Sequence, residues 1–325
     1  MGKMNSLNSQ SSKLETSQLL CKSNKEWMAQ LPEKLQDIPL YNMALPGSHD
    51  AMSYCLDISS PIDRSESQLL QSLDKCVPCI TRPLIYKWST TQELSIKEQL
   101  NAGIRYLDLR ISHKPNDTSD KLYFVHGIFT EVTVQDILKE IAVWLQHHKK
   151  EVIILACRCL EELNPEQHLN LVNLLITTFG NMICPKQEYP TLNTLWRHGY
   201  QVIISYENDI EKQYKQLWPA APYWWGNTVD PQELLNYLEK QKQKGRPEQF
   251  FVAGINLTED LSFIMCHLCE SLKEITLSNQ HYFIPWVKNQ TPGDGKKCIN
   301  IVAADFIDSG SFVNDVIALN EKLLQ

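Results

Sequence analysis

The chain lacks any long apolar run. Its longest uninterrupted apolar stretch is the six residues 152–157, whereas a membrane-spanning helix needs about 20. The first 25 residues also lack the apolar core of a secretory signal. We therefore expect no spanning helix and a cytoplasmic location, where thiols stay reduced.

Positive charge is in deficit. Lys and Arg total 31 against 38 for Asp and Glu, which gives a formal net charge of −7. A mildly acidic protein has no overall field that attracts nucleic acid, so we expect no nucleic-acid partner. No Gly-x-Gly-x-x-Gly follows an apolar strand either, which excludes the usual dinucleotide-binding fingerprint.

The ten cysteines include two close pairs, Cys76-x-x-Cys79 and Cys266-x-x-Cys269. Together the pairs could supply four zinc ligands. Zinc-binding pairs usually lie much closer together in sequence, and no Gly-rich knuckle surrounds either of these. We favour the alternative that they are buried, small apolar residues in a reduced protein.

The chain of 325 residues is long enough for one large domain, and its 43% hydrophobic and 21% charged residues are an ordinary globular balance. Residues 1–23 are rich in Ser, Asn, Gln and Lys, so we expect a flexible N-terminal arm. No Pro/Gly/Ser-rich linker divides the remainder. We therefore expect a single domain over residues 24–325.

Strand and helix patterns alternate along this domain. Residues 152–157 form an apolar, β-branched run that is typical of a buried parallel strand. Residues 133–146 have apolar positions at helical spacing, which predicts a helix, and Thr133 at their start resembles its cap. About seven strands favour an α/β fold, a TIM-like (β/α) barrel that is irregular or not fully closed. The other expected strands are 40–45, 104–111, 122–125, 201–206, 250–255 and 300–306, and the other expected helices include 169–179, 231–244 and one from Phe312 to Leu323.

Polar residues gather where these strands end. Barrel enzymes place reactive groups at the C-terminal ends of their strands. Taken singly, each residue has a plain structural explanation, such as a solvated histidine or a surface ion pair. Their coincidence at apolar strand ends favours chemistry. The candidates are His49, Asp50, Asp108, Arg110, His126, Arg158 and Asp305.

This set of side chains suits a particular reaction. Two histidines can act in turn as acid and base, and a carboxylate can orient an imidazole and stabilise its cation. A guanidinium can hold a phosphate as charge builds on it. The set therefore fits attack on a phosphodiester by a neighbouring hydroxyl. No serine elbow, Walker motif or His-Glu-x-x-His helix competes with it.

Three motifs resemble the X region of phosphatidylinositol-specific phospholipase C. They are Pro-Gly-Ser-His-Asp at 46–50, Gln-Leu-Asn-Ala-Gly-Ile-Arg-Tyr-Leu-Asp-Leu-Arg at 99–110 and Phe-Val-His-Gly at 124–127. The resemblance extends through 151–158 and 301–306, so it covers nearly all of 27–325. It is closest to the small family members that have the X domain alone.

The resemblance implies cleavage of inositol phospholipids to diacylglycerol and an inositol phosphate. His49 would be the base that takes the proton of the inositol 2-hydroxyl, and His126 the acid that protonates the leaving glycerol oxygen. Asp305 would pair with His49, and Asp50 would lie beside His126. Arg110 would stabilise the phosphoryl charge, with Asp108 holding it. Arg158 and Tyr206 would contact the inositol, although bacterial relatives carry Arg at the second position.

The same comparison bears on metal. Calcium-dependent relatives have an amide at the position of Asp50 and carboxylates at those of Arg110 and Arg158. Calcium prefers oxygen ligands, and two guanidiniums would repel it while supplying the positive charge that it brings. The resemblance therefore implies no calcium, and we expect no metal or other cofactor.

Three alternatives stay open. The first is a catalytically silent phosphoinositide-binding protein on the same barrel. The second is a ribonuclease-like enzyme, which the net charge disfavours. The third is a glycerophosphodiesterase, which normally uses a metal held by carboxylates and which the two arginines disfavour.

An inositol lipid substrate requires transient membrane contact. The start Met1-Gly2-Lys3-Met4-Asn5-Ser6 fits the pattern for N-myristoylation of Gly2, and one such chain gives weak, reversible binding. The aromatic cluster Trp218, Tyr223, Trp224 and Trp225 is either a rim that meets the membrane or a packed loop.

Overall fold

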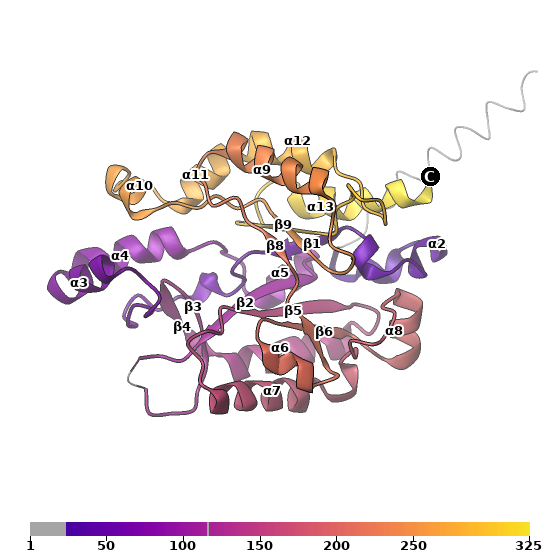
Figure 1. The fold of residues 1–325 in the computed structure, drawn as a ribbon, viewed down its shortest axis with the longest axis horizontal. Helices are drawn as coiled ribbons and strands as arrows, with labels where there is room; N and C mark the ends of the chain where they lie inside the picture. Colours follow the sequence, from indigo (N-terminus) through magenta and orange to yellow (C-terminus); the bar gives the residue numbers. More distant parts are fainter. Residues whose placement is uncertain (1–23, 116) are drawn as a thin grey trace, which may run out of the picture.

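The computed structural model describes residues 24–115 and 117–325, and eight parallel strands form the centre of this part (Figure 1). Their order in the sheet is β7-β6-β5-β2-β1-β10-β9-β8. The predicted division into an arm and a domain stays a prediction, because residues 1–23 lie outside the described residues. The parallel strands are β1 (Leu45–Ser48), β2 (Tyr106–Ser112), β5 (Ile153–Arg158), β6 (Val202–Tyr206), β7 (Leu217–Pro219), β8 (Tyr223–Trp224), β9 (Val252–Gly254) and β10 (Ile301–Ala304).

The parallel sheet curls into a barrel that is not closed by a continuous ladder. No strand pairing joins β7 to β8 within 24–115 and 117–325. Only residues 220–222 separate these strands, far fewer than the dozen or more that a crossover between parallel strands needs. Ser205 bridges the step, since its Oγ donates to the carbonyl of Pro219 and accepts from the amide of Ala221. The predicted irregular (β/α) barrel is confirmed.

A hairpin outside the barrel corrects one prediction. We expected a barrel strand at 122–125, and β3 (Tyr123–His126) does form there. It runs antiparallel to β2, with Ile111 opposite Phe124, and pairs with β4 (Ile128–Thr133). His126 therefore ends a hairpin strand rather than a barrel strand.

Helices cover the outside of the sheet, and local sequence signals set their ends. Helix α6 begins after Thr133, whose side chain accepts from the amide of Asp136, as its capping pattern predicted. Helix α7 begins four residues earlier than expected because Asn164 caps it and Pro165 fits the first helical position. The helices are α2 (Glu33–Gln36), α3 (Gln68–Cys76), α4 (Pro78–Ser89), α5 (Ile96–Ala102), α6 (Val134–His147), α7 (Pro165–Phe179), α8 (Leu192–His198), α9 (Pro231–Lys244), α10 (Leu261–Cys266), α11 (Leu272–Ser278), α12 (Gln280–Lys288) and α13 (Phe312–Ala318).

The bounds of the first strand and of the last helix also differ from the predictions. The first strand begins at Leu45 rather than at residue 40, because Leu40–Asn42 forms a 3-10 turn. The last helix ends at Ala318 and continues as a 3-10 helix over Leu319–Leu324. No helix within 24–115 and 117–325 is both long enough and apolar enough to cross a bilayer.

Side chains alternate between the interior of the barrel and the helix layer. Leu107 and Leu109 of β2 belong to the larger apolar cluster, together with residues of α6 and α7. Tyr106 belongs to a second cluster with strand residues such as Ile154. The interior is tight at Gly47, where an added Cβ would lie 3.0 Å from a ring carbon of Tyr106.

A buried ion pair closes the N-terminal end of the barrel. Arg105 is fully buried, and its Nε and Nη2 donate to Glu151 Oε2 over 2.9 and 2.6 Å. The guanidinium also donates to the carbonyls of Leu100 and Lys25. Glu151 accepts in addition from the amide of Ala29, over 3.0 Å. The pair thus ties residues 25–29 to the barrel.

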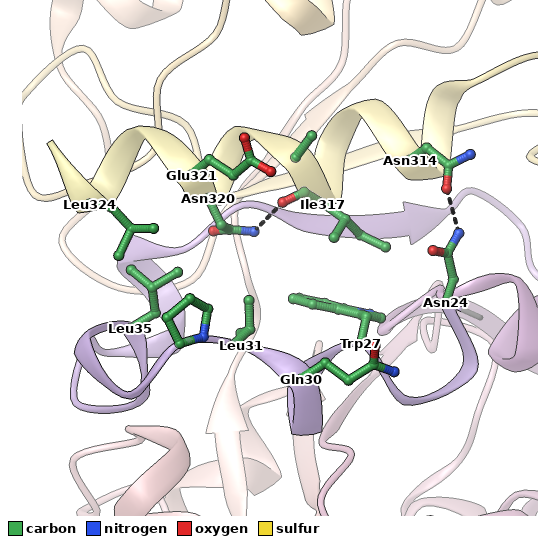
Figure 2. Close-up of a pocket in the computed structure, with 12 residues that line it drawn as sticks. Asn24, Trp27, Gln30, Leu31, Leu35, Asn314, Ile317, Asn320, Glu321 and Leu324 are labelled. Atoms are coloured by element: carbon green, nitrogen blue, oxygen red, sulfur yellow. Dashed lines mark hydrogen bonds between the residues drawn. The ribbon is translucent and has the colours of Figure 1, made fainter. Parts of the chain in front are cut away.

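A shallow apolar groove lies at this same end, between residues 24–35 and the C-terminal helices (Figure 2). Trp27 and Leu31 line one side, and Ile317 and Leu324 line the other. Asn24 closes one end by donating to Asn314 Oδ1 over 2.6 Å. The groove is far from the strand ends that carry the candidate residues, so it is not the predicted site.

Breaking the buried pair should destabilise the fold strongly. We expect Glu151→Ala to lower the free energy of unfolding by about 3–5 kcal/mol, because it leaves the Arg105 guanidinium buried without a counter-charge. Urea unfolding followed by circular dichroism measures the change. Lys273→Ala, which breaks the exposed pair with Glu93, is the control and should cost less than about 1 kcal/mol. Equal effects of the two variants would contradict the assignment.

Candidate active site

The candidate residues meet at the C-terminal end of the barrel, and a sharp backbone turn follows four of them. A left-handed backbone is uncommon outside glycine and is enriched at functional sites. Such a turn leads the chain away from the strand end while the preceding side chain stays in the site. The left-handed residues are Asp50 (φ 42°) after His49, Gly127 (φ 69°) after His126, Cys159 (φ 54°) after Arg158 and Phe306 (φ 47°) after Asp305.

His49 lies at the centre of the site with a defined tautomer. Its Nδ1 is 2.7 Å from Asp305 Oδ1, and its Nε2 is 2.7 Å from Nη2 of Arg110. A guanidinium can only donate, so Nε2 accepts and the ring proton is on Nδ1, where it is donated to Asp305. His49 and Asp305 are both buried. This geometry leaves Nε2 as the basic atom of His49.

The carboxylates around His49 favour its cation. Burial alone would lower the pKa of His49, but the charges of Asp305 and Asp50 outweigh it and raise the pKa above the usual value. Burial raises the pKa of Asp305, against the opposing effect of His49. The imidazole is therefore held in a place where a proton taken up at Nε2 is stabilised.

Asp50 links the two imidazoles. Its Oδ2 is 3.4 Å from His49 Nε2 and 3.3 Å from His126 Nε2, and its Oδ1 is 2.9 Å from Nε of Arg110. The rings of the two histidines are 6.2 Å apart. His126 Nδ1 donates to the carbonyl of Ser89 over 2.7 Å, so its Nε2 faces the site. A carboxylate therefore stands between two imidazoles that both present Nε2.

The two arginines lie side by side on neighbouring strands. Arg110 of β2 is in register with Arg158 of β5. Asp108 lies beneath them, fully buried, with Oδ2 3.6 Å from Nη2 of Arg110. Burial opposes the charged form of Asp108, but Arg110 and Arg158 outweigh it and lower its pKa. Arg158 is also paired with Glu207, over 3.4 Å.

Buried polar atoms without partners mark the floor of the site. The hydroxyl of Tyr106, Oδ1 of Asp108 and Oδ2 of Asp305 are buried and make no hydrogen bond within the described residues. Buried polar groups are rarely left unpaired in folded proteins. Their grouping here indicates a site that binds a polar ligand or water.

Tyr223 is a site residue that the sequence assigned only to an aromatic cluster. The Arg158 guanidinium lies over its ring, 4.8 Å from the centroid, and its hydroxyl donates to Asn256 Oδ1. The rest of the cluster divides: Trp218 and Trp224 are buried, as a packed loop predicts, whereas Trp225 is 49% exposed.

Two acidic residues in loops were missed because no strand pattern leads to them. Burial raises the pKa of Glu259 to about 7, with a further contribution from Asp305. Burial also raises the pKa of Glu66, while His126 opposes this shift. One carboxyl therefore lies on the side of His49 and the other on the side of His126.

The structure does not bring Tyr206 to the site, so its predicted contact with the inositol is wrong. The side chain faces the helix layer, is fully buried, and has its hydroxyl 2.9 Å from Nδ1 of His168. Its neighbour Ser205 faces the interior instead, because alternate residues of a strand face opposite sides.

One group within the described residues has metal-ligand geometry. The ligand atoms of His49, Asp50 and Asp108 lie within 4.8 Å of one another. The Arg110 guanidinium contacts a ligand atom of each. A cation there would meet this guanidinium, so the residues do not fit calcium. The two cysteine pairs do not gather into such a group within 24–115 and 117–325. All four of these cysteines are exposed, so their expected burial is wrong.

Removing the Asp305 charge should lower the pKa of His49. We expect the Asp305→Asn variant to titrate His49 at a lower pH than the wild type, because the imidazolium loses its closest carboxylate. Histidine ring resonances followed by NMR through the titration measure this shift. Asp308→Asn removes an exposed carboxylate of the same loop and should leave the value unchanged. An unchanged or higher pKa in Asp305→Asn would refute the pairing.

Comparison with known proteins gives a consistent result. The sequence profile described as "Phosphatidylinositol-specific phospholipase C, X domain" matches residues 83–208. PI-PLC X domain-containing protein 1 of Homo sapiens is 51% identical over 310 residues, which cover 95% of this chain and 96% of that protein. PI-PLC X domain-containing protein 3 of Danio rerio is 37% identical over 305 residues, which cover 92% and 94%.

Solved structures share the fold at low sequence identity. Phosphatidylinositol-specific phospholipase C from Listeria monocytogenes aligns with a TM-score of 0.64 and 20% identity, covering 92% of this chain and 99% of that one. A variant of the Staphylococcus aureus enzyme aligns with a TM-score of 0.64 and 14% identity, covering 93% and 99%. The barrel is therefore of the bacterial phosphatidylinositol-specific phospholipase C type.

Proposed function

This chain belongs to the family of PI-PLC X domain-containing proteins, and we propose that it is a metal-independent phosphodiesterase that cleaves inositol phospholipids. The carrying observation is Asp50, which lies within 3.4 Å of Nε2 of both His49 and His126 and also contacts Arg110. The site thus brings together a general base, a general acid and a guanidinium. Cleavage of a phosphodiester by a neighbouring hydroxyl needs these three groups around the phosphorus.

His49 supplies the base in this proposal. Its Nε2 takes the proton of the inositol 2-hydroxyl as that oxygen forms a bond to phosphorus. Asp305 holds the ring through Nδ1 and stabilises the imidazolium. In this step the Arg110 guanidinium exchanges its contact with His49 Nε2 for contacts with the phosphoryl oxygens. It then stabilises the negative charge that develops on them.

His126 supplies the acid. As the bond from phosphorus to the glycerol oxygen breaks, Nε2 of His126 donates its proton to that oxygen, and diacylglycerol leaves. Ser89 fixes the other ring nitrogen as a donor, and Asp50 Oδ2 lies 3.3 Å from the Nε2 that carries this proton. The inositol product of attack by a neighbouring hydroxyl is a cyclic phosphodiester, which water can open with the two roles reversed.

Arg158 and Tyr223 form the binding wall for the inositol ring in this proposal. Their stacked arrangement offers a flat apolar surface beside fixed donors. Asp108 keeps Arg110 and Arg158 charged and in place from below. Glu207 accepts from Arg158 and from the amide of Cys159, and the remaining lone pairs of its carboxylate can accept from an inositol hydroxyl.

Arg110 takes the place that a metal would hold. It contacts His49, Asp50 and Asp108, the three residues with metal-ligand geometry. Its charge is permanent, since Asp50 and Asp108 raise its pKa against the effect of burial. The proposed chemistry therefore needs no calcium.

The substrate places the reaction at a membrane surface. One of the related solved structures concerns the modulation of membrane binding by the Staphylococcus aureus enzyme. We extend transient membrane contact to this chain, because a lipid headgroup must reach His49 and Arg110 from a bilayer. Myristoylation of Gly2 and a cytoplasmic location stay predictions, and Gly2 lies outside the described residues.

Both histidines should be needed for turnover. We expect His49→Ala and His126→Ala each to lower the rate of lipid cleavage on vesicles containing phosphatidylinositol by about 10²-fold or more. Both variants should keep the unfolding temperature of the wild type. His147→Ala removes an exposed imidazole of α6 and is the control at full rate. Near-wild-type rates in either site variant, on every inositol lipid tested, would refute the mechanism. A wild-type protein that binds such vesicles without turnover would instead be the silent phosphoinositide-binding alternative.

Activity should survive a chelator. Purified protein treated with EDTA and EGTA should keep its full rate, whereas Arg110→Ala should lose about 10²-fold, since one transition-state contact is commonly worth about 3 kcal/mol. A calcium-dependent phospholipase assayed in parallel shows that the chelator works. Loss of the rate in chelator, with recovery on adding calcium, would contradict the proposal.

A further inference from the structure

The exposed cysteines of the described residues are all on one side of the molecule. Cys76 and Cys79 lie at the turn between α3 and α4, and Cys266 and Cys269 lie at the end of α10 and just beyond it. The other cysteines of the described residues are partly or fully buried. Helices α3, α4 and α10 lie together at one end of the molecule in Figure 1.

Exposed apolar side chains surround these thiols. Ile80 is 66% exposed, Leu69 58% and Met265 53%, with Val77 and Leu268 also exposed. Neither α3 nor α10 has a buried residue, although both are rich in apolar side chains. Grouped exposed apolar side chains mark a surface that contacts something. We call the four cysteines and these five apolar residues the cysteine face.

Packing joins the helices that carry the two cysteine pairs. Trp88 of α4 meets Phe263 of α10 edge to face, with ring centroids 6.0 Å apart. Leu84 packs in the same small cluster, and the Lys87 ammonium donates to the carbonyl of Leu268. The two Cys-x-x-Cys segments are thus carried by elements that touch each other.

Helix α4 links the cysteine face to the candidate active site. Ser89, the last residue of α4, accepts the hydrogen bond of His126 Nδ1. Trp88 packs with Phe306, the residue after Asp305. Helix α4 therefore ends at the edge where a lipid substrate would enter, and its first turn carries Cys79 about 15 Å from that end.

The charge of this segment suits a bilayer surface. Over α3 and α4 the charged residues are Asp74, Lys75, Arg82 and Lys87. Arg82 is paired with Asp74, so Lys75 and Lys87 carry the positive excess of this segment. Basic residues near a cytoplasmic leaflet are attracted to its anionic lipids. The exposed apolar side chains, the two lysines and the link through α4 to the site all point to a bilayer as the occupant of this face.

We propose that the two Cys-x-x-Cys pairs are S-acylation sites that anchor the cysteine face to a bilayer. Cysteines on amphipathic segments next to a membrane are the usual substrates of reversible S-acylation. A single lipid chain gives only marginal anchoring, so further chains convert transient contact into stable attachment. Acylation here would hold the site mouth against the lipid.

The chemistry is a thioester exchange with a fatty acyl-coenzyme A, catalysed by a membrane acyltransferase. The cysteine sulfur bonds to the acyl carbonyl carbon, the bond from that carbon to the coenzyme A sulfur breaks, and the cysteine proton ends on the released coenzyme A thiol. No electrons are exchanged. Exposed thiols can enter such an enzyme, whereas buried ones cannot.

The test is metabolic labelling of the full chain in eukaryotic cells with an alkynyl palmitate. We expect label that hydroxylamine removes, since hydroxylamine cleaves thioesters and spares an amide-linked chain on Gly2. The variant with Cys76, Cys79, Cys266 and Cys269 all changed to Ser should lose at least four-fifths of this label. Its membrane-bound fraction should fall several-fold, and its unfolding temperature should match the wild type.

Matched variants separate the outcomes. Cys298→Ser changes a partly buried cysteine and should keep the label, as should Cys21→Ser. The proposal is overturned if the wild type carries no hydroxylamine-sensitive label, if the four-serine variant keeps it, or if Cys21→Ser removes it. It is also overturned if intact mass shows each pair as a disulfide, or if the purified unacylated chain forms a dimer that Leu69→Glu and Ile80→Glu abolish.

The inference rests on the proposed function in one respect, because a lipid substrate is the reason for this edge to face a bilayer. The labelling test uses no turnover. A protein that cleaves no lipid but carries the label would refute the function alone. A protein that cleaves lipid but carries no label would refute the inference alone.

Discussion

The Arg110 guanidinium makes the site possible, because three carboxylates share the same buried end of the barrel. Asp50, Asp108 and Asp305 are each nearly or fully buried, and carboxylates of like charge oppose one another's ionisation at this range. Arg110 contacts the first two directly and His49 in addition. Without its charge, burial of Asp108 would meet less opposition, and the pKa of this carboxyl would rise.

Strand β2 and the residue before it use arginine for two purposes. Arg105 precedes the strand and faces the same side as Leu107 and Leu109, where its charge is fully paired with Glu151. Arg110 faces the interior, where its side chain is about a quarter exposed. One guanidinium is committed to holding the fold, and the other keeps contacts that a phosphate could replace. The alternation of side chains along one strand therefore separates structural charge from site charge.

The sequence predicted β2 well and the end of β6 badly, for one physical reason. In β2, Tyr106, Asp108 and Arg110 are polar while Leu107 and Leu109 are apolar, so the face that turns inward could be recognised. Both faces of β6 are apolar until Ser205, so nothing in its pattern showed that Tyr206 faces the helices. The pairing of β3 also depends on β4, which periodicity alone did not predict. Tyr223 and Glu259 enter the site through non-local packing, which no local pattern encodes.

Helix α4 extends from the exposed surface of the molecule to His126, the proposed acid of the site. Its last carbonyl accepts from His126 Nδ1 and so fixes the tautomer that leaves Nε2 facing Asp50. Gly127 allows this approach, because a Cβ there would lie 2.5 Å from Ser89 Oγ. The first turn of the same helix carries Cys79 and Ile80 to the exterior. A helix of twelve residues spans about 18 Å, so one rigid element sets both how the exposed face is presented and which nitrogen of His126 can exchange a proton.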